Sequence, residues 1–526
     1  MKILIVCVIF LQFVCIKAFS GTRKSNGTLS LPSYFDDHMV LQKAPAYASI
    51  WGYSTIGDDV IVVSLLDTGA RVVQFSATVV YIGPENKAVW KVFLEPVKAG
   101  GPYSVVVESD HGSALTINDV LFGDVWVCSG QSNMQFTLPM AYNGSKEVAE
   151  AAAYPDIRLF TASLKTADTP QYDFISVEET WSVASPSSVG NGNWTYFSAV
   201  CYLYGKDLYQ KLKYPIGLVA SDWGGTAIEV WSSPDALKKC QIKDNSTTKS
   251  DLNVAPTAHS VLWNAMIHPF LNYTIYGTIW YQGELNSGNP LGYNCSFPAM
   301  IDDWRLKFSE SNPQTSSSFP FGFVQLAPRL NDSSITTGYP DIRWSQTAGY
   351  GTVPNPRMKD VFMALAMDLP DFTSPFQSVH PRDKETVASR LTLSGLAVAY
   401  GKVEKFQGPY PSDVKFSQGN KQLTITYDMG LTNIEVRSAK GFEFCCSSSQ
   451  DKTVCDQPSL NSWFPVTTLA STPTTLILDV PASCTNQHIL LIRYAWRESP
   501  CPYKQCAVYS VVNELPGPPF KISLIV

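Results

Sequence analysis

The stretch Asp124-Val-Trp-Val-Cys-Ser-Gly-Gln-Ser-Asn-Met134 decides the fold of the central part of the chain. Its apolar run, 125–128, has the length of a buried strand, and the small residues Ser129 and Gly130 end that run in a sharp turn. In an open α/β sheet, ligands bind at the carboxyl ends of the strands. Ser132 follows this strand directly, so its hydroxyl is predicted to project there as a nucleophile. The alternative is a turn serine that only caps the next helix.

After a predicted signal peptide, the pattern of predicted strands and helices divides the chain into three modules. Residues 29–119 contain short strands separated by turn residues, which predicts a β-sandwich-like domain. Residues 120–405 alternate strands with helices, which predicts an α/β domain with a central parallel sheet. Residues 406–526 return to short strands and hold six of the cysteines, which predicts a disulfide-stapled β domain. The expected architecture is therefore β, then α/β, then β.

The N-terminus is typical of a protein that enters the secretory route. Residues 1–20 combine Lys2, an apolar run and a small residue at Ala18 or Ser20, which predicts a cleaved signal peptide; a retained anchor is the alternative. Seven N-x-S/T sequons predict glycosylation. They begin at Asn26, Asn143, Asn193, Asn245, Asn272, Asn294 and Asn331. We therefore expect a secreted or lysosomal protein without a later membrane span, and a net charge of −6 without a basic cluster argues against nucleic acid as a partner.

A nucleophilic serine needs a general base, and the chain offers only six histidines. Three of them, at 38, 111 and 488, fall in the predicted β modules, while His259 and His268 flank a predicted helix. His380 follows the last predicted strand of the sheet and precedes the closing helix, 385–399. It is therefore expected at the same edge of the sheet as Ser132, although the segment is also compatible with a plain loop.

Two further strand ends carry groups suited to holding an oxyanion. The turn at Gly225 has no side chain to block a backbone N–H, and Gln282 brings an uncharged amide donor, supported by Glu284 and Asn286. Trp223 and Tyr281 stand beside these donors and are expected to bind substrate by stacking on a glycan, with a place in the core as the alternative.

Four blocks of sequence thus converge on one edge of the predicted sheet. They are Gly130-Gln131-Ser132-Asn133-Met134, Trp223-Gly-Gly-Thr226, Trp280-Tyr-Gln-Gly-Glu-Leu-Asn286 and His380-Pro381-x-Asp383-Lys384. Together they resemble the SGNH (GDSL-like) hydrolases, in the branch of the sialate O-acetylesterases, and the resemblance extends over most of the chain. It implies a serine esterase that removes O-acetyl groups from sialic acids or sialoglycans through an acetyl-enzyme, with 9-O-acetyl as the expected target. It also implies Ser132 as nucleophile and His380 as base, with no cofactor and no metal.

One position departs from the pattern of that superfamily. An aspartate usually stands three residues before the histidine, where this chain has Gln377. A glutamine can accept a hydrogen bond from the imidazole and orient it, but it does not stabilise the charged ring as a carboxylate does. Three accounts follow: a backbone carbonyl orients His380, a carboxylate such as Asp371, Asp368 or Glu284 does so from elsewhere, or the chain is catalytically weak. The rival functions are an acetylesterase for other glycans and a glycan-binding homologue with an inactive core.

Overall fold

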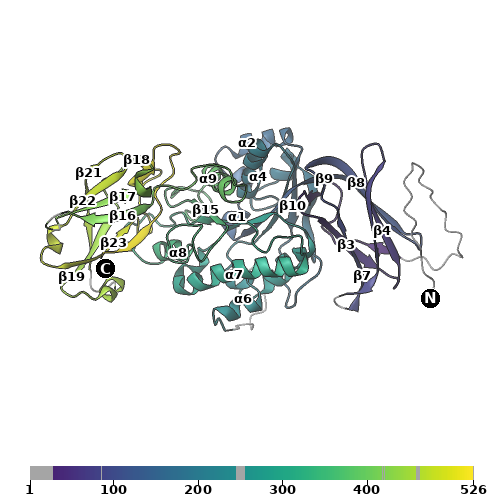
Figure 1. Cartoon of the computed structure of the whole chain (residues 1–526), viewed down its shortest axis with the longest axis horizontal. Coiled ribbons are helices and arrows are strands. Elements are labelled where there is room, and N and C mark those ends of the chain that lie inside the picture. The colour runs from purple at the N-terminus through teal and green to yellow at the C-terminus, as the bar shows by residue number, and fades with distance from the viewer. Residues whose placement is uncertain are drawn as a thin grey trace.

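The computed structural model describes residues 28–83, 86–243, 255–417, 419, 421–457 and 462–524. The predicted signal peptide, 1–20, and the sequons at Asn26 and Asn245 lie outside these residues. Figure 1 shows a β-rich N-terminal part, a central part of mixed strands and helices, and a β-rich C-terminal part in a row. The expected β, α/β, β architecture is confirmed.

The N-terminal part is built from two layers of strands. One is a four-stranded sheet in the order β1-β3-β7-β6, and the other pairs β5, β4 and β8 with the start of β9. The bounds are β1 (Leu29–Ser30), β2 (Val40–Gln42), β3 (Ala48–Ser54), β4 (Val60–Leu66), β5 (Val72–Val79), β6 (Tyr81–Ile82), β7 (Ala88–Leu94) and β8 (Gly100–Ser109). In β4 every second side chain, Ile61, Val63 and Leu65, is buried, as the period of two in a strand requires.

Strand β9 (Ala114–Gly130) joins this sandwich to the central sheet. Its first half pairs antiparallel with β8, and its last seven residues pair parallel with β12, from Asp124 opposite Ile216 to Gly130 opposite Asp222. Between these segments β2 adds a short parallel pairing. The boundary expected at 119/120 therefore falls inside one continuous strand.

The central sheet has the strand order β11-β10-β12-β9-β13-β14-β15. The bounds are β10 (Ile157–Ala162), β11 (Val177–Val183), β12 (Ile216–Asp222), β13 (Gly277–Tyr281), β14 (Phe321–Gln325) and β15 (Val361–Leu365). All pairings are parallel except that of β11, an antiparallel edge strand that the sequence did not suggest. Strands β12 to β15 are buried along their whole length, which requires covering layers on both faces.

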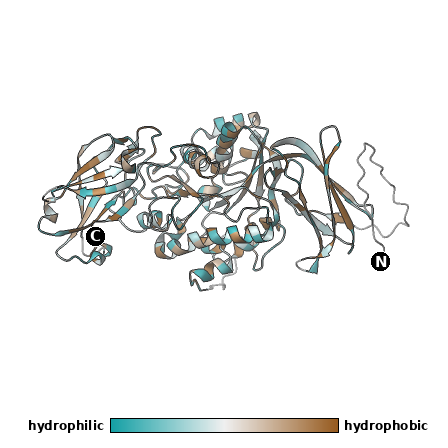
Figure 2. Cartoon of the chain, viewed as in Figure 1, coloured by the Kyte–Doolittle hydropathy of each residue, from teal (hydrophilic) through white to brown (hydrophobic). Residues whose placement is uncertain are grey.

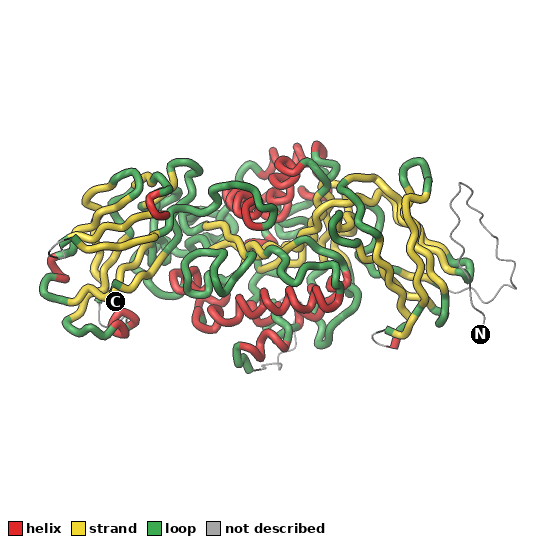
Figure 3. The backbone as a smooth tube through the Cα atoms, viewed as in Figure 1, coloured by secondary structure: helices red, strands yellow, loops and turns green. Residues whose placement is uncertain are grey.

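Helices supply these two layers (Figures 1 and 3). Helices α4 and α9 cover one face and α7 with α6 and α8 covers the other. The bounds are α1 (Ser132–Gln135), α2 (Gly144–Glu150), α3 (Pro186–Val189), α4 (Ala199–Leu212), α5 (Ile228–Trp231), α6 (Pro234–Lys239), α7 (Pro290–Ser311), α8 (Tyr339–Ser345) and α9 (Lys384–Val398). Figure 2 shows hydrophobic and hydrophilic residues side by side on α7, as a helix on the outer layer needs.

The sequence predicts a helix over 300–308, whereas helix α7 begins ten residues earlier, at Pro290. Asn289 caps it by accepting a hydrogen bond from the Gly292 N–H at 3.1 Å, and Pro290 occupies the first turn, where a proline is tolerated. Pro298 lies inside the helix, and this residue is what made the first half unlike a helix in the sequence. None of the described helices is both long and apolar enough to cross a membrane.

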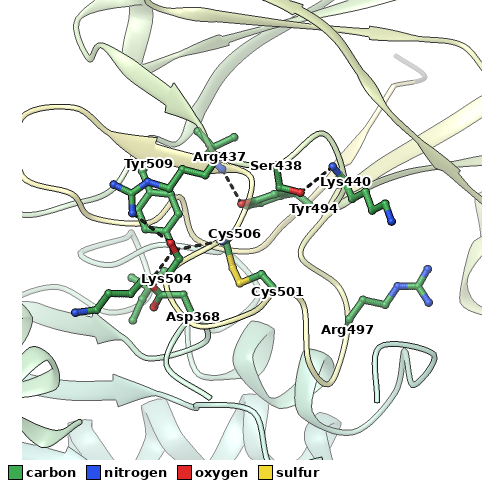
Figure 4. The surroundings of a disulfide bond; sticks show 12 residues. Asp368, Arg437, Ser438, Lys440, Tyr494, Arg497, Cys501, Lys504, Cys506 and Tyr509 are labelled. Atoms are coloured by element: carbon green, nitrogen blue, oxygen red, sulfur yellow. Dashed lines mark hydrogen bonds between the residues drawn. A yellow bond between two sulfur atoms is a disulfide. The ribbon is translucent and has the colours of Figure 1, made fainter. Parts of the chain in front are cut away.

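The C-terminal part holds three sheets, β16-β17-β22-β21, β20-β19-β23-β25 and β18-β24. The bounds are β16 (Pro411–Phe416), β17 (Gln422–Tyr427), β18 (Ile434–Val436), β19 (Phe442–Ser447), β20 (Trp463–Val466), β21 (Thr468–Ser471), β22 (Thr475–Asp479), β23 (His488–Tyr494), β24 (Val508–Ser510) and β25 (Phe520–Ser523). The loop closed by the Cys501–Cys506 disulfide reaches the central part, because the Lys504 N–H and the Tyr509 hydroxyl both donate to Asp368 (Figure 4).

Five disulfides join the ten described cysteines. The pairs are Cys128–Cys201, Cys240–Cys295, Cys445–Cys455, Cys446–Cys484 and Cys501–Cys506. Disulfides in this number are typical of proteins that fold in an oxidising compartment, outside the cytosol. The first pair ties the strand before the Ser132 turn to helix α4.

Candidate active site

A sharp turn between β9 and α1 presents Ser132 at the carboxyl end of the central sheet. Gly130 makes this turn possible, because its φ is 141° and a Cβ there would lie 2.2 Å from the Tyr281 carbonyl oxygen. The Gln131 N–H then donates to that same oxygen at 3.0 Å. Ser132 is the first residue of α1, so its backbone N–H has no partner within the helix and points away from the helix end.

His380 lies directly against this serine, although the two residues are 248 positions apart. Its Nε2 is 2.8 Å from the Ser132 Oγ, and its Nδ1 is 2.5 Å from the carbonyl oxygen of Phe376. A carbonyl oxygen only accepts, so Nδ1 carries the proton and Nε2 is left to accept from the serine hydroxyl. This is the tautomer that a general base requires.

The three carboxylates considered as alternative orienters of His380 have other partners, and for Glu284 this is the Asn133 amide, at 2.7 Å. Both oxygens of Asp371 accept from the Arg382 guanidinium, at 2.7 and 2.9 Å, and Asp368 is paired with Arg390. The Gln377 side chain is exposed and its backbone is left-handed, with φ 73°. A backbone carbonyl thus stands where the aspartate stands in a Ser–His–Asp triad. The Asp371–Arg382 ion pair instead closes the loop that carries the histidine.

The surroundings of His380 favour its neutral form. Burial lowers the pKa of the imidazole, the hydrogen bond to Phe376 partly opposes this, and the positive charge of Lys384 lowers the pKa further. The ring of Trp194 stands edge-on to the imidazole, with 5.0 Å between the ring centres. His380 can consequently accept a proton at pH values below the ordinary pKa of histidine, because its imidazole stays neutral there.

The glycine turn after β12 approaches the serine closely. A Cβ on Gly224 would lie 3.1 Å from the Ser132 Cβ, so any larger residue would crowd the serine. The Gly224 N–H donates to Gln135 Oε1 at 2.8 Å. The next residue, Gly225, is exposed and has a left-handed φ of 71°, which leaves its backbone open to the rim of the site.

The expected direct role of Gln282 as an oxyanion donor does not agree with its contacts. Its side-chain nitrogen donates to the Thr226 carbonyl oxygen at 3.2 Å and to Asn286 Oδ1 at 2.7 Å, which uses both of its N–H groups. Asn286 also accepts from the Ile228 N–H and donates to Glu229. Gln282 and Asn286 therefore fix the segment 226–229, which follows the glycine turn.

Of the two aromatic residues expected to bind substrate, only one is accessible. Tyr281 is fully buried and contacts Lys384 within the core, so the expectation that it stacks on a glycan is wrong. Its position as the last residue of a central strand explains this burial. Trp223 is half-buried at the rim, and its contact with substrate stays a prediction.

The sequons differ in how far they are exposed. Asn143, Asn193 and Asn331 are exposed, whereas Asn272 and Asn294 are half-buried. Asn272 also accepts a hydrogen bond from Lys91. Glycosylation stays a prediction at each of them.

A group with metal-ligand chemistry occurs in the N-terminal sandwich, away from Ser132. Asp59, Asp110 and His111 offer ligand atoms within 4.8 Å of one another. Asp59 already accepts from the hydroxyls of Ser54 and Ser109, and His111 lies against both carboxylates, which raises the pKa of the imidazole. These hydrogen bonds account for the cluster without an ion.

Several residues of the site escaped sequence reasoning. The Phe376 carbonyl could not be found because every residue has one, and Trp194 comes from a loop without any motif. Asn133 and Lys384 were inside the quoted blocks, yet only the structure shows that they contact each other, at 2.6 Å.

Comparison with known proteins adds to this geometry. A family model described as "Carbohydrate esterase, sialic acid-specific acetylesterase" matches residues 122–336, and one described as "Sialate O-acetylesterase C-terminal domain" matches residues 412–524. The sialate O-acetylesterase of Rattus norvegicus is 45% identical over 522 residues, with 93% of each chain covered. That of Homo sapiens is 44% identical over 497 residues, covering 93% of this chain and 91% of its own.

A solved structure resembles the whole architecture. The crystal structure of a carbohydrate acetylesterase from Xanthomonas citri has a TM-score of 0.74 at 26% identity and covers 94% of this chain and 100% of that one. The similarity spans all three parts of the chain rather than the central sheet alone.

Proposed function

The chain belongs to the sialate O-acetylesterase family and is a carboxylic ester hydrolase, and from that premise we propose that it removes O-acetyl groups from sialic acids by way of an acetyl-enzyme. The 9-O-acetyl group is the expected target. The single observation that carries the proposal is the 2.8 Å contact between Ser132 Oγ and His380 Nε2, with the proton of the imidazole held on Nδ1.

Acylation begins when His380 Nε2 takes the hydroxyl proton as Ser132 Oγ attacks the acetyl carbonyl carbon. Negative charge then develops on the former carbonyl oxygen. The backbone N–H groups of Ser132 and Gly225 are the donors best placed to meet it, each worth about 3 kcal/mol of barrier on the scale of oxyanion-hole deletions. His380 passes its proton to the departing sugar oxygen, and acetyl remains on the serine.

Deacylation repeats these steps with water. His380 removes a proton from the water molecule, hydroxide attacks the acetyl carbon, and the proton returns to Ser132 as acetate leaves. The imidazole needs no carboxylate to stay oriented through both steps, because the Phe376 carbonyl accepts from Nδ1 throughout.

Labelling of the serine tests the covalent mechanism. A fluorophosphonate should add to Ser132, with the adduct located by mass spectrometry, and Ser132→Ala should take up no label. Label on another serine, or turnover that survives Ser132→Ala, would refute the proposed nucleophile.

The substrate is tested separately from the mechanism. We expect the protein to release acetate from 9-O-acetylated sialic acid faster than from acetylated xylan. The reverse preference would favour an acetylesterase for other glycans, a reading that the similarity to the Xanthomonas citri carbohydrate acetylesterase keeps open. Absence of turnover on either substrate would favour the glycan-binding homologue.

The compartment follows from the covalent structure and the expected leader. With five disulfides and a signal peptide predicted at 1–20, we propose that the protein is secreted or lysosomal. The lowered pKa of His380 leaves more of the imidazole neutral in an acidic lumen than an ordinary histidine would have.

A further inference from the structure

Lys384 is buried beneath the proposed active site, and the steps above make no use of it. Its side chain is fully enclosed at the start of α9. The ammonium nitrogen donates to Asn133 Oδ1 at 2.6 Å and lies over the rings of Phe136 and Tyr281, at 4.5 and 5.2 Å from their centres. Burial of a lysine is costly unless its charge is matched, so this placement calls for a reason.

The amide that receives this hydrogen bond joins the two halves of the site. Asn133 Nδ2 donates to Glu284 Oε1 at 2.7 Å and to the Val379 carbonyl oxygen at 2.9 Å. Asn133 directly follows the serine, and Val379 directly precedes the histidine. One side chain therefore bridges the chain neighbours of the nucleophile and of the base.

Lys384 fixes which way this amide faces. Two acceptors lie on one side of Asn133, so its NH₂ group must face them and its oxygen must face the opposite side, where only a donor is tolerated. The lysine supplies that donor. Without it, the buried oxygen would lose its partner, and the amide could rotate away from the Val379 carbonyl.

Three carboxylates act on the charge of the lysine. Glu284 faces it across the Asn133 amide, and Asp383 and Asp371 face it from the loop before α9. Burial lowers the pKa of Lys384 to about 7 and raises the pKa of Glu284. Burial lowers the pKa of the His380 imidazole, and the charge of the lysine lowers it further, whereas a triad aspartate would raise it.

We propose that Lys384 is a positioning residue for the Ser132–His380 pair: it locks the Asn133 amide that holds the nucleophile helix against the base loop. The inference rests on the proposed function in so far as these two residues react. The charge of the same ammonium adds to the burial that lowers the pKa of His380.

Lys384→Met removes the donor and the charge while keeping the length of the side chain. On p-nitrophenyl acetate we expect kcat per labelled active site to fall about tenfold to a hundredfold, the range for a small misplacement of reacting groups, with KM changed less than about twofold. In the pH–rate profile, the fall of kcat/KM at acidic pH (the pH limb) should begin at a higher pH, because removing a positive charge raises the pKa of His380. A purely structural role would lower only the number of sites that take up fluorophosphonate.

Three further variants separate the contributions. Lys384→Gln keeps a donor without a charge, so it should restore most of kcat but retain the shifted pH limb. Asn133→Leu breaks the same bridge with the lysine in place, and it decides the question where Lys384→Met does not fold. Lys206→Met is the matched control, because Lys206 is a buried lysine paired with Glu147 in another part of the domain. It should lower Tm and leave both kcat per site and the pH limb unchanged.

An unchanged kcat per site and an unchanged pH limb in Lys384→Met, or an unchanged kcat in Asn133→Leu, would overturn the inference. These outcomes are distinct from failure of the proposed function. Full turnover in Ser132→Ala would remove the proposed nucleophile, and lack of activity on sialic acid esters alone would change the substrate but not the role of the lysine.

Discussion

The sharpest test of how the base is held is the substitution of Gln377, the residue at the position of the usual triad aspartate. Its side chain is exposed, and the imidazole donates its Nδ1–H to the main-chain carbonyl of the preceding residue, Phe376. Gln377→Ala should therefore leave His380 where it is. The left-handed backbone at 377 carries a similar strain with alanine as with glutamine, so the loop should keep its shape.

The expected magnitudes are well separated. Surface substitutions without a specific contact change free energies by up to about 0.5 kcal/mol, which corresponds to about a twofold change in kcat/KM. Loss of a general base costs about 10²- to 10⁴-fold, and loss of the serine nucleophile at least about a thousandfold. The assay is kcat/KM for p-nitrophenyl acetate at pH 7, measured for Gln377→Ala, His380→Ala and Ser132→Ala, with Tm as the check on folding.

A loss in Gln377→Ala as large as that in His380→Ala, at an unchanged Tm, would refute this account. It would mean that the glutamine side chain, and not the Phe376 carbonyl, fixes the tautomer of the imidazole. A loss that came with a lower Tm would be repeated with Gln377→Asn, because asparagine tolerates the left-handed backbone better than most residues.

Three other outcomes follow from the same site. The base must be neutral to accept a proton and the pKa of His380 is lowered, so kcat/KM should rise with pH through an apparent pKa below 6.5, measured by a pH–rate profile. Gly130→Ala should prevent activity and lower Tm, since a methyl group there would collide with the Tyr281 carbonyl, as thermal unfolding would show. Replacing Cys128 and Cys201 together by serine should lower stability by about 4 kcal/mol for a loop of this length, measured by denaturant unfolding; a change under 1 kcal/mol would contradict it.

Much of the architecture was accessible from sequence because local patterns and burial agree there. The apolar run before Ser129 could only be a central strand, and the run of short strands at each end of the chain predicted the β modules. The meeting of Ser132 and His380 followed from a rule of topology, since the carboxyl ends of parallel strands share one edge. The sequence could also limit the base to one histidine, because only His380 stood at that edge.

The remaining features depend on contacts that leave no local pattern. Tyr281 looked like a rim residue since it precedes a polar turn, but it is fully enclosed, with Lys384 over its ring. The two N–H groups of Gln282 looked free, and only the approach of Thr226 and Asn286 shows how they are used. The start of α7 was hidden by Pro298, and the role of Lys384 depends on an amide 251 positions away.

Because β9 is continuous, the position of the N-terminal sandwich is coupled to that of the central sheet. The same strand is an edge strand of the sandwich and a central strand of the sheet that ends at the Ser132 turn. A rotation of the sandwich about the direction of β9 would therefore also change the orientation of Ser132. The N-terminal module thus supports the central sheet through this shared strand and is not a separate domain joined by a linker. A fragment that starts at residue 120 would lack the first part of β9. We expect Ser132 to be misplaced in such a fragment even where the hydrophobic core of the central part still forms.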